Sequence, residues 1–166
     1  HFIEANLNSF NLCSSSQSLF NSKHLLNWSL QHGANPEVII VDVYPKMWTS
    51  NGIESCRDLT VNHDHALQPQ LIKMALETHD PFNLFLALYS GITRTFKPLS
   101  FPGQRDIYKT GGFTYSVRNP IDTLHCTPVK IEMSITQRRA FRSIRQTCEE
   151  EGIQLILINP PQLCEE

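Results

Sequence analysis

The sequence predicts an α/β fold in which parallel strands alternate with helices. Residues 38–41 form an unbroken β-branched run, and residues 153–158 form a second apolar run of strand length. Strands that are apolar throughout are typical of parallel sheets covered on both faces. Each run follows a helix-like segment after a short link, which is the spacing of α/β units. With 166 residues, we expect a single α/β domain over residues 1–166.

The first third of the chain is predicted to form a strand, a turn, a helix and a second strand. Residues 9–12 are brief and half apolar, which indicates a short strand, and residues 13–17 turn the chain. A helix is expected over residues 17–32, with Gly33 as its stop signal. The strand over residues 37–43 ends before Pro45, which cannot donate to a central ladder.

Between residues 46 and 119 the pattern changes. Residues 47–52 look like a loop, and helices are expected over residues 70–78 and from Asp80-Pro81 to Tyr89, with aspartate as cap and proline in the first turn. The glycines and prolines that follow have weak periodicity. We interpret residues 46–119 as a helical, loop-rich insertion or lid.

The last third repeats the helix-to-strand pattern. Ser134 and Gln137 have the spacing of a capping box, which begins a helix that runs to about Glu151. Gly152 closes this helix, and the apolar strand over residues 153–158 ends at Asn159-Pro160-Pro161.

Composition argues against several classes of protein. Lys plus Arg is 14 and Asp plus Glu is 16, so the net charge of −2 offers no broad basic surface for a nucleic acid. No apolar run reaches the 18 or so residues of a membrane span. Five cysteines without a CxxC pair make a disulfide framework or a zinc-thiolate site a poor expectation. No cofactor motif is recognised, so none is expected.

The turn after the first predicted strand is the first place to look for a ligand, because such folds bind ligands at strand carboxyl ends. Backbone N–H groups and the hydroxyls of Ser14, Ser15 and Ser16 there could hold an oxyanion or a phosphate, with Gln17 beside them. Alternatively, one serine caps the helix and the others are solvated. The segment lacks P-loop glycines and a G-x-S-x-G motif, which favours the second interpretation.

Asp42 and Tyr44 flank the end of the second predicted strand. An acid there could orient a base or a ligand hydroxyl, or it could bond to a nearby backbone N–H, and the sequence does not separate the two. His63-Asp64-His65 suggests a metal site, but it lies among turn residues without an obvious third ligand. A polar surface loop is the better interpretation, and no metal site is assigned. His24 and His32 are expected to be exposed or near the helix end.

Three of these segments together resemble the SGNH-hydrolase-like proteins, the bacterial GDSL esterase and acyltransferase relatives. Residues 9–18 resemble the serine-rich loop of that family, residues 38–45 the following strand, and residues 156–161 a later strand that ends in proline; Gly111-Gly112-Phe113 fits the insertion. The resemblance implies a three-layer, flavodoxin-like fold and chemistry on O-acyl esters, often of cell-envelope carbohydrate. It also implies a serine nucleophile, a histidine base with an aspartate, and an oxyanion-binding loop.

The chain departs from that family pattern in several ways. The nucleophile segment would precede residue 1, and the Asp-x-x-His segment would follow Glu166, so no catalytic residue is identified. Cys13 stands where the family has glycine. Only the loop over residues 13–17 is carried over, as an oxyanion or substrate-binding candidate.

Two principal interpretations follow from the resemblance. The first is an SGNH-like esterase or acyltransferase that is catalytically incomplete in this chain, with a small-molecule or carbohydrate ester as ligand. The second is a non-catalytic binding or structural module with the same fold. A third is an unrelated flavodoxin-like protein that binds a phosphate at the serine turn. A cell-envelope location is implied by the resemblance alone, and the oligomeric state is not readable.

Overall fold

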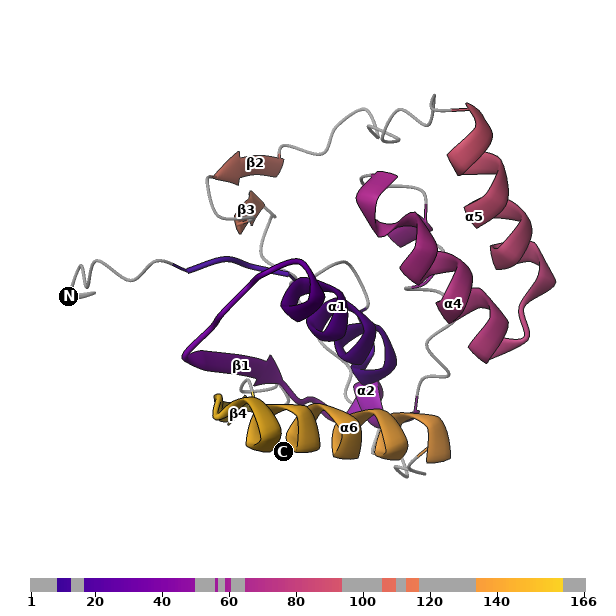
Figure 1. Cartoon of the computed structure of the whole chain (residues 1–166). Helices are drawn as coiled ribbons and strands as arrows, with labels where there is room; N and C mark the ends of the chain where they lie inside the picture. The colour runs from indigo at the N-terminus through magenta and orange to yellow at the C-terminus, as the bar shows by residue number, and fades with distance from the viewer. Residues whose placement is uncertain are drawn as a thin grey trace, which may run out of the picture.

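The computed structural model describes residues 9–12, 17–49, 56, 59–60, 65–93, 106–109, 113–116 and 134–159. Its elements are arranged as Figure 1 shows. In chain order they are α1 (Leu19–Gln31), β1 (Val38–Asp42), α2 (Pro45–Thr49), the 3-10 helix η1 (His65–Leu67), α4 (Gln68–Thr78), α5 (Pro81–Thr93), β2 (Asp106–Lys109), β3 (Phe113–Ser116), α6 (Ile135–Glu151) and β4 (Gln154–Ile158).

Strands β1 and β4 pair in parallel, from Val38 beside Gln154 to Asp42 beside Ile158. This confirms an α/β unit in which a strand follows a helix twice. The strand predicted over residues 9–12 is wrong: no strand is assigned there, and the side chain of Phe10 is 70% exposed. A short, half-polar segment forms a strand only when it pairs with a neighbouring strand. Here β1 pairs with β4 instead.

Helices α1 and α6 cover one face of the β1–β4 pair. Successive strand side chains point to opposite faces, so Ile39, Val41 and Leu155 face these helices and contribute to the core. On the opposite face Val38 and Ile40 are 43% and 61% exposed, and their neighbours on β4 are also exposed. The described residues therefore form one helical layer against an apolar sheet whose second face is open.

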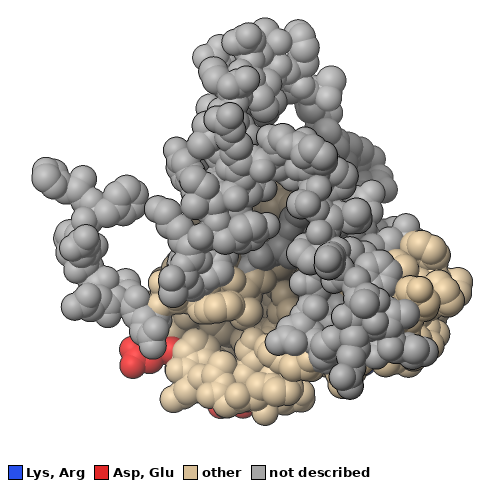
Figure 2. Space-filling view, turned by 90° about the horizontal axis from the view of Figure 1, so that it is seen from above, with Lys and Arg blue, Asp and Glu red and all other residues tan. Residues whose placement is uncertain are grey.

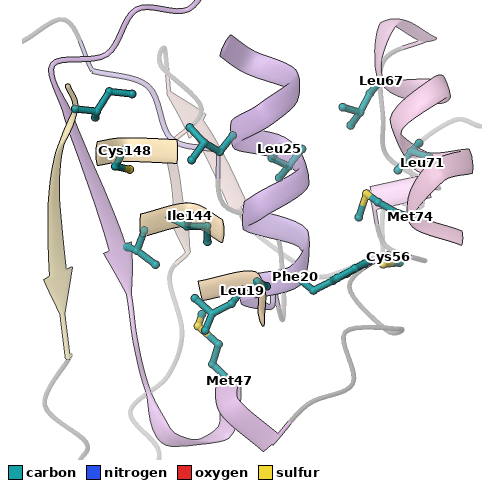
Figure 3. Close-up of a cluster of buried hydrophobic side chains, with 14 of the residues drawn as sticks. Leu19, Phe20, Leu25, Met47, Cys56, Leu67, Leu71, Met74, Ile144 and Cys148 are labelled. Atoms are coloured by element: carbon teal, nitrogen blue, oxygen red, sulfur yellow. The ribbon is translucent and has the colours of Figure 1, made fainter. Parts of the chain in front are cut away.

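Helix α1 lies between two groups of buried side chains (Figure 3). Leu19 lies toward α6, where Ile144 and Cys148 are buried, whereas Leu25 lies on the side of α1 that faces α4. Helices α4 and α5 form a hairpin beside α1 (Figure 1). The second helix of this hairpin, α5, begins at the predicted aspartate cap. The carboxylate of Asp80 accepts hydrogen bonds from the backbone N–H groups of Phe82 and Asn83 at 3.1 and 3.3 Å.

The prediction of a loop over residues 47–52 is wrong for its first residues, which belong to the short helix α2. Met47 is buried in the core, and the Trp48 ring packs edge-to-face on Phe141 of α6 with centroids 5.4 Å apart. Two large apolar side chains one position apart hold this segment against α6, although its local pattern is loop-like.

Both helix stops predicted from glycine are confirmed. Gly33 has φ +88°, and Gly152 has φ +68° as the C-cap of α6, where its N–H bonds to the carbonyl of Cys148. The capping box predicted at the start of α6 is wrong, although the helix begins where expected. Ser134 makes no side-chain cap bond, and the side chain of Gln137 reaches α1 instead.

Charged side chains lie on the outer face of α6. Arg138, Arg139, Arg142 and Arg145 are exposed, and Arg145 pairs with Glu149 at 3.2 Å in an exposed i,i+4 bridge. In the view from above, the visible described surface is mainly uncharged (Figure 2). None of the described helices is long and apolar enough to span a membrane.

Candidate functional site

The carboxyl ends of β1 and β4 and the amino ends of α1 and α6 meet at one rim of the sheet. Just past β1, the N–H of Val43 donates to the carbonyl of Ile158 at 2.7 Å. The N–H of Ser134, which precedes α6, donates to the carbonyl of Trp48 at 2.9 Å. We call these strand and helix ends the carboxyl rim. In parallel α/β folds this is the edge where ligands bind.

Gln17 and Ser18 begin α1 at the carboxyl rim. Ser18 is the helix N-cap, with its hydroxyl accepting from the N–H of Asn21 at 3.3 Å. Gln17 is half-buried, and its side-chain amide donates to the hydroxyl of Ser22 at 2.9 Å. A serine therefore caps the helix, but it is Ser18. The predicted candidates Ser14, Ser15 and Ser16 lie outside the described residues.

The amino end of α1 has protein partners for its first-turn donors. The N–H of Phe20 donates to Gln137 Oε1, and that of Asn21 donates to Ser18. Free first-turn N–H groups are what makes a helix start attract anions. An anion bound here would therefore depend on donors that precede Phe20.

Asp42 and Tyr44 lie at the carboxyl rim but in different surroundings. Asp42 is exposed, and no described residue donates a hydrogen bond to its carboxylate. The alternation along β1 places it on the open face with Ile40, whereas α1 covers the other face. Tyr44 is half-buried against the core, and its carbonyl accepts from the N–H of Met47 at 3.0 Å. Gln17 contacts Ser22, Asp42 is exposed and Tyr44 packs against the core, so the three residues share a rim but have different surroundings.

A second polar group lies inside the molecule, between α1 and α4. The His24 side chain is 1% exposed, although the sequence predicts it to be exposed or near a helix end. Its Nε2 lies 3.1 Å from Glu77 Oε2, and its Nδ1 lies 2.5 Å from the side-chain amide nitrogen of Gln70. Lys23 Nζ lies 3.1 Å from the same Glu77 oxygen. The phenyl ring of Phe20, one turn earlier on α1, meets the imidazole edge-to-face.

These partners fix one form of the His24 ring. The Gln70 amide nitrogen carries only donors, so it donates to Nδ1, and the single proton of the neutral ring is on Nε2, facing Glu77. Burial, reinforced by the charge of Lys23, lowers the pKa of His24 to about 4 against the opposing effect of Glu77. Burial opposes ionisation of Glu77, yet its contacts with His24 and Lys23 hold the pKa of this carboxyl below its usual range.

His24 is therefore a structural residue rather than a base for a bound substrate. A general base needs a nitrogen within hydrogen-bond reach of the proton it removes, and both nitrogens of His24 already have protein partners. The sequence did contain a signal of burial. His24 lies four residues after the apolar Phe20, and residues four apart share a helix face.

Buried polar groups also connect α1 with α5 through Cys56 and Thr60. The Asn21 amide donates to Cys56 Sγ at 3.3 Å, and the Thr60 hydroxyl lies 2.8 Å from the Cys56 carbonyl and 3.0 Å from Asn83 Oδ1. Burial raises the pKa of the Cys56 thiol to about 11; the charge of Asp80 adds to this, and the Asn21 bond opposes it. A thiol held protonated in this way is a poor nucleophile.

Asn83 is 1% exposed, and its Nδ2 has no partner among the described residues. The Thr60 hydroxyl has one proton, so it cannot donate to both the Cys56 carbonyl and Asn83 Oδ1. Rotating the Asn83 amide by half a turn pairs Nδ2 with the Thr60 oxygen and leaves the Thr60 proton for Cys56. The rotation leaves Oδ1 in the position that Nδ2 held, so one buried polar atom of Asn83 has no partner among the described residues in either orientation.

No metal centre is formed by the described residues, since no three His, Cys, Asp or Glu side chains among them are grouped to hold an ion. Cys56 and Cys148 are free, buried thiols. The chain matches no family model, no curated protein sequence and no solved structure.

Proposed function

We propose that this chain is an SGNH-like α/β protein that binds O-acyl esters at the carboxyl rim, with acylated carbohydrate of the cell envelope as the ligand class. The observation that carries the proposal is the shared rim, where the ends of β1, β4, α1 and α6 meet. Strand ends and helix starts present polar groups there without disturbing the core. The serine-rich sequence ahead of Gln17 precedes this same rim.

Asp42 supports a carbohydrate ligand. An exposed carboxylate with no described protein donor is available to accept hydrogen bonds from sugar hydroxyls. Gln17 supports an acyl group at the same rim, because its side-chain amide is held by Ser22 at the amino end of α1. An ester carbonyl accepts hydrogen bonds from amide donors of this kind.

The open sheet face supports a three-layer, flavodoxin-like architecture as the complete fold. Val38, Ile40, Ile156 and Ile158 are apolar and between 37% and 61% exposed on that face. Parallel strands of this composition are normally covered by helices on both faces. A second helical layer over these residues would remove this apolar surface from water.

Non-catalytic binding is the second candidate function, and the partners of three described histidines are consistent with it. His24 is buried with both nitrogens engaged. His32 Nδ1 and His79 Nδ1 lie 2.7 and 2.8 Å from carbonyls of their own helical segments. Among these three imidazoles none is hydrogen-bonded to a serine or cysteine, which is one common way to activate a nucleophile.

The test is binding of an O-acetylated oligosaccharide and of its de-acetylated form to the native protein, by titration calorimetry. We expect binding of the acetylated form that is at least several-fold tighter, and we expect Asp42→Asn and Gln17→Ala to weaken it. The matched controls are Glu37→Gln and Gln154→Ala, which change exposed residues at the amino ends of β1 and β4. These controls should bind as the wild type does.

Equal affinity for the two sugars, or no binding of either, would contradict the proposal. Release of p-nitrophenol from p-nitrophenyl acetate separates the two candidate functions. Turnover that Asp42→Asn or Gln17→Ala reduces supports an esterase, whereas acetyl-specific binding without turnover supports the binding module.

A further inference from the structure

Helix α5 presents an uncharged aromatic surface to solvent. Phe82, Phe85, Leu88 and Tyr89 are exposed by 44–60%, and they recur at helical spacing along one side. The rings of Phe85 and Tyr89 stack with centroids 5.8 Å apart. The opposite side of α5 is closed, because Ala87 is fully buried and its carbonyl accepts from Gln68 of α4. We call these four exposed residues the α5 stripe.

The α5 stripe is a group of neighbouring exposed side chains on one helix rather than a set of scattered ones. Its four side chains are exposed by 44–60%. At about 200 Å² for each large side chain, this leaves roughly 400 Å² of mostly carbon surface. A typical monomer's largest apolar patch is about 300–600 Å², and such patches are often functional. Standard interfaces bury about 800 Å² per partner, so the stripe would supply about half of one side.

The absence of charged residues on α5 favours a protein partner over a lipid surface. Helices that bind at membrane surfaces combine their apolar face with lysine and arginine on the polar face. From Pro81 to Thr93 the sequence of α5 contains no charged residue, and the described surface on its side of the molecule is uncharged in Figure 2. The surface therefore lacks the basic anchor of a lipid-binding helix.

We propose that the α5 stripe is the interface of a two-fold symmetric homodimer. In a two-fold contact, residues near the axis meet their own copies, so a charged stripe would repel itself, whereas an uncharged one does not. Antiparallel packing of the two α5 helices about an axis at Phe85 puts this residue against the partner's Phe85. The same axis puts Phe82 against the partner's Leu88. The stripe is thus complementary to itself.

The experiment measures the mass of the native protein by sedimentation equilibrium across a wide range of concentration. We expect a concentration-dependent dimer that Phe85→Lys converts to monomer, with Phe82→Lys acting in the same direction. The matched control is Ile135→Lys at the start of α6, where an apolar side chain is 68% exposed and lies outside the stripe. This control should remain a dimer. Circular dichroism establishes that each variant retains its helices.

Three results would overturn the proposal. They are a monomer at every concentration, a dimer unaffected by both stripe substitutions, and a monomer that co-sediments with phosphatidylcholine–phosphatidylglycerol vesicles through the same residues. The test is independent of the proposed ester ligand, because Phe82 and Phe85 lie on α5 and not among the elements that form the carboxyl rim.

Discussion

The N–H of Phe20 in α1 donates a hydrogen bond to the side-chain oxygen of Gln137 in α6 at 3.0 Å, across 117 positions of sequence. Gln137 is 0% exposed and Phe20 is 4% exposed. The bond uses one of the donors that every helix start leaves unpaired. It therefore fixes the amino end of α1 to α6 and sets the position of the carboxyl rim.

Replacing Gln137 with methionine should lower the free energy of unfolding by about 1–3 kcal/mol. Methionine has a similar shape but leaves the buried Phe20 N–H without its acceptor. Urea denaturation measures the change, with Gln146→Met as control, because Gln146 is exposed on the same helix. The control should change stability by no more than about 0.5 kcal/mol. Equal losses in both variants would show that the bond to Phe20 has no special role.

Acid should destabilise the protein through His24. Burial first, and Lys23 second, lower its pKa from 6.5 to about 4, so between these values the unfolded chain binds a proton that the folded chain does not. Stability contributed by neutral His24 is complete above pH 6.5 and declines as the pH falls toward 4. The difference between the two values corresponds to about 3 kcal/mol.

His24→Gln should flatten this decline, whereas His32→Gln, at an exposed position just after α1, should preserve it. The measurement is urea denaturation at several pH values from 4 to 7. A wild-type stability that stays constant or rises as the pH falls through this window would refute the assignment.

The thiol of Cys56 should resist alkylation in the folded protein. A pKa near 11 instead of the usual 9.0 leaves about a hundredfold less thiolate at pH 8, and the side chain is 0% exposed. Peptide mass spectrometry after iodoacetamide treatment measures the labelling, with protein unfolded in urea as the reference. Cys148, which is 2% exposed with its pKa raised by burial, should be protected in the same way. Native labelling of Cys56 as fast as in urea would contradict its buried position.

Gly152→Ala should cost about 1–2 kcal/mol, because its φ of +68° is a left-handed conformation that side chains disfavour. No atom lies within 4 Å of an added Cβ, so the cost comes from the backbone alone. Gly152→Asn is the matched variant, since asparagine tolerates this conformation better. Thermal unfolding should rank wild type first, asparagine second and alanine last. Alanine as stable as glycine would be the contrary result.

Local pattern located most of the described elements. The bounds of α1, α4, α6, β1 and β4 lie within two residues of those predicted, because apolar periodicity and terminal glycines act within a few turns of chain. For α5 the start was predicted, but the helix continues four residues beyond Tyr89. The segment over residues 9–12 and helix α2 were predicted wrongly. Strand pairing in the first case and packing of Met47 and Trp48 in the second depend on distant neighbours.

The candidate site was predictable only in part. Asp42, Tyr44 and Gln17 do lie at the end of β1 and the start of α1, as chain order requires for parallel strands. Asp42 lies on the open face and Gln17 on the helical side. This placement depends on which sheet face α1 covers, and the sequence of a single strand does not encode that choice. Both faces of β1 are apolar enough to be buried.

The sequence by itself determined α1, α4, α6, β1, β4 and the start of α5, because hydrophobic spacing and glycine conformation are properties of neighbouring residues. Only the tertiary structure decided the partners of Gln137, His24 and Cys56. Each partner lies 35 or more positions away in the sequence, and no local sequence pattern identifies such pairs. A buried polar group must find a partner, but which one it finds is fixed by how the helices pack.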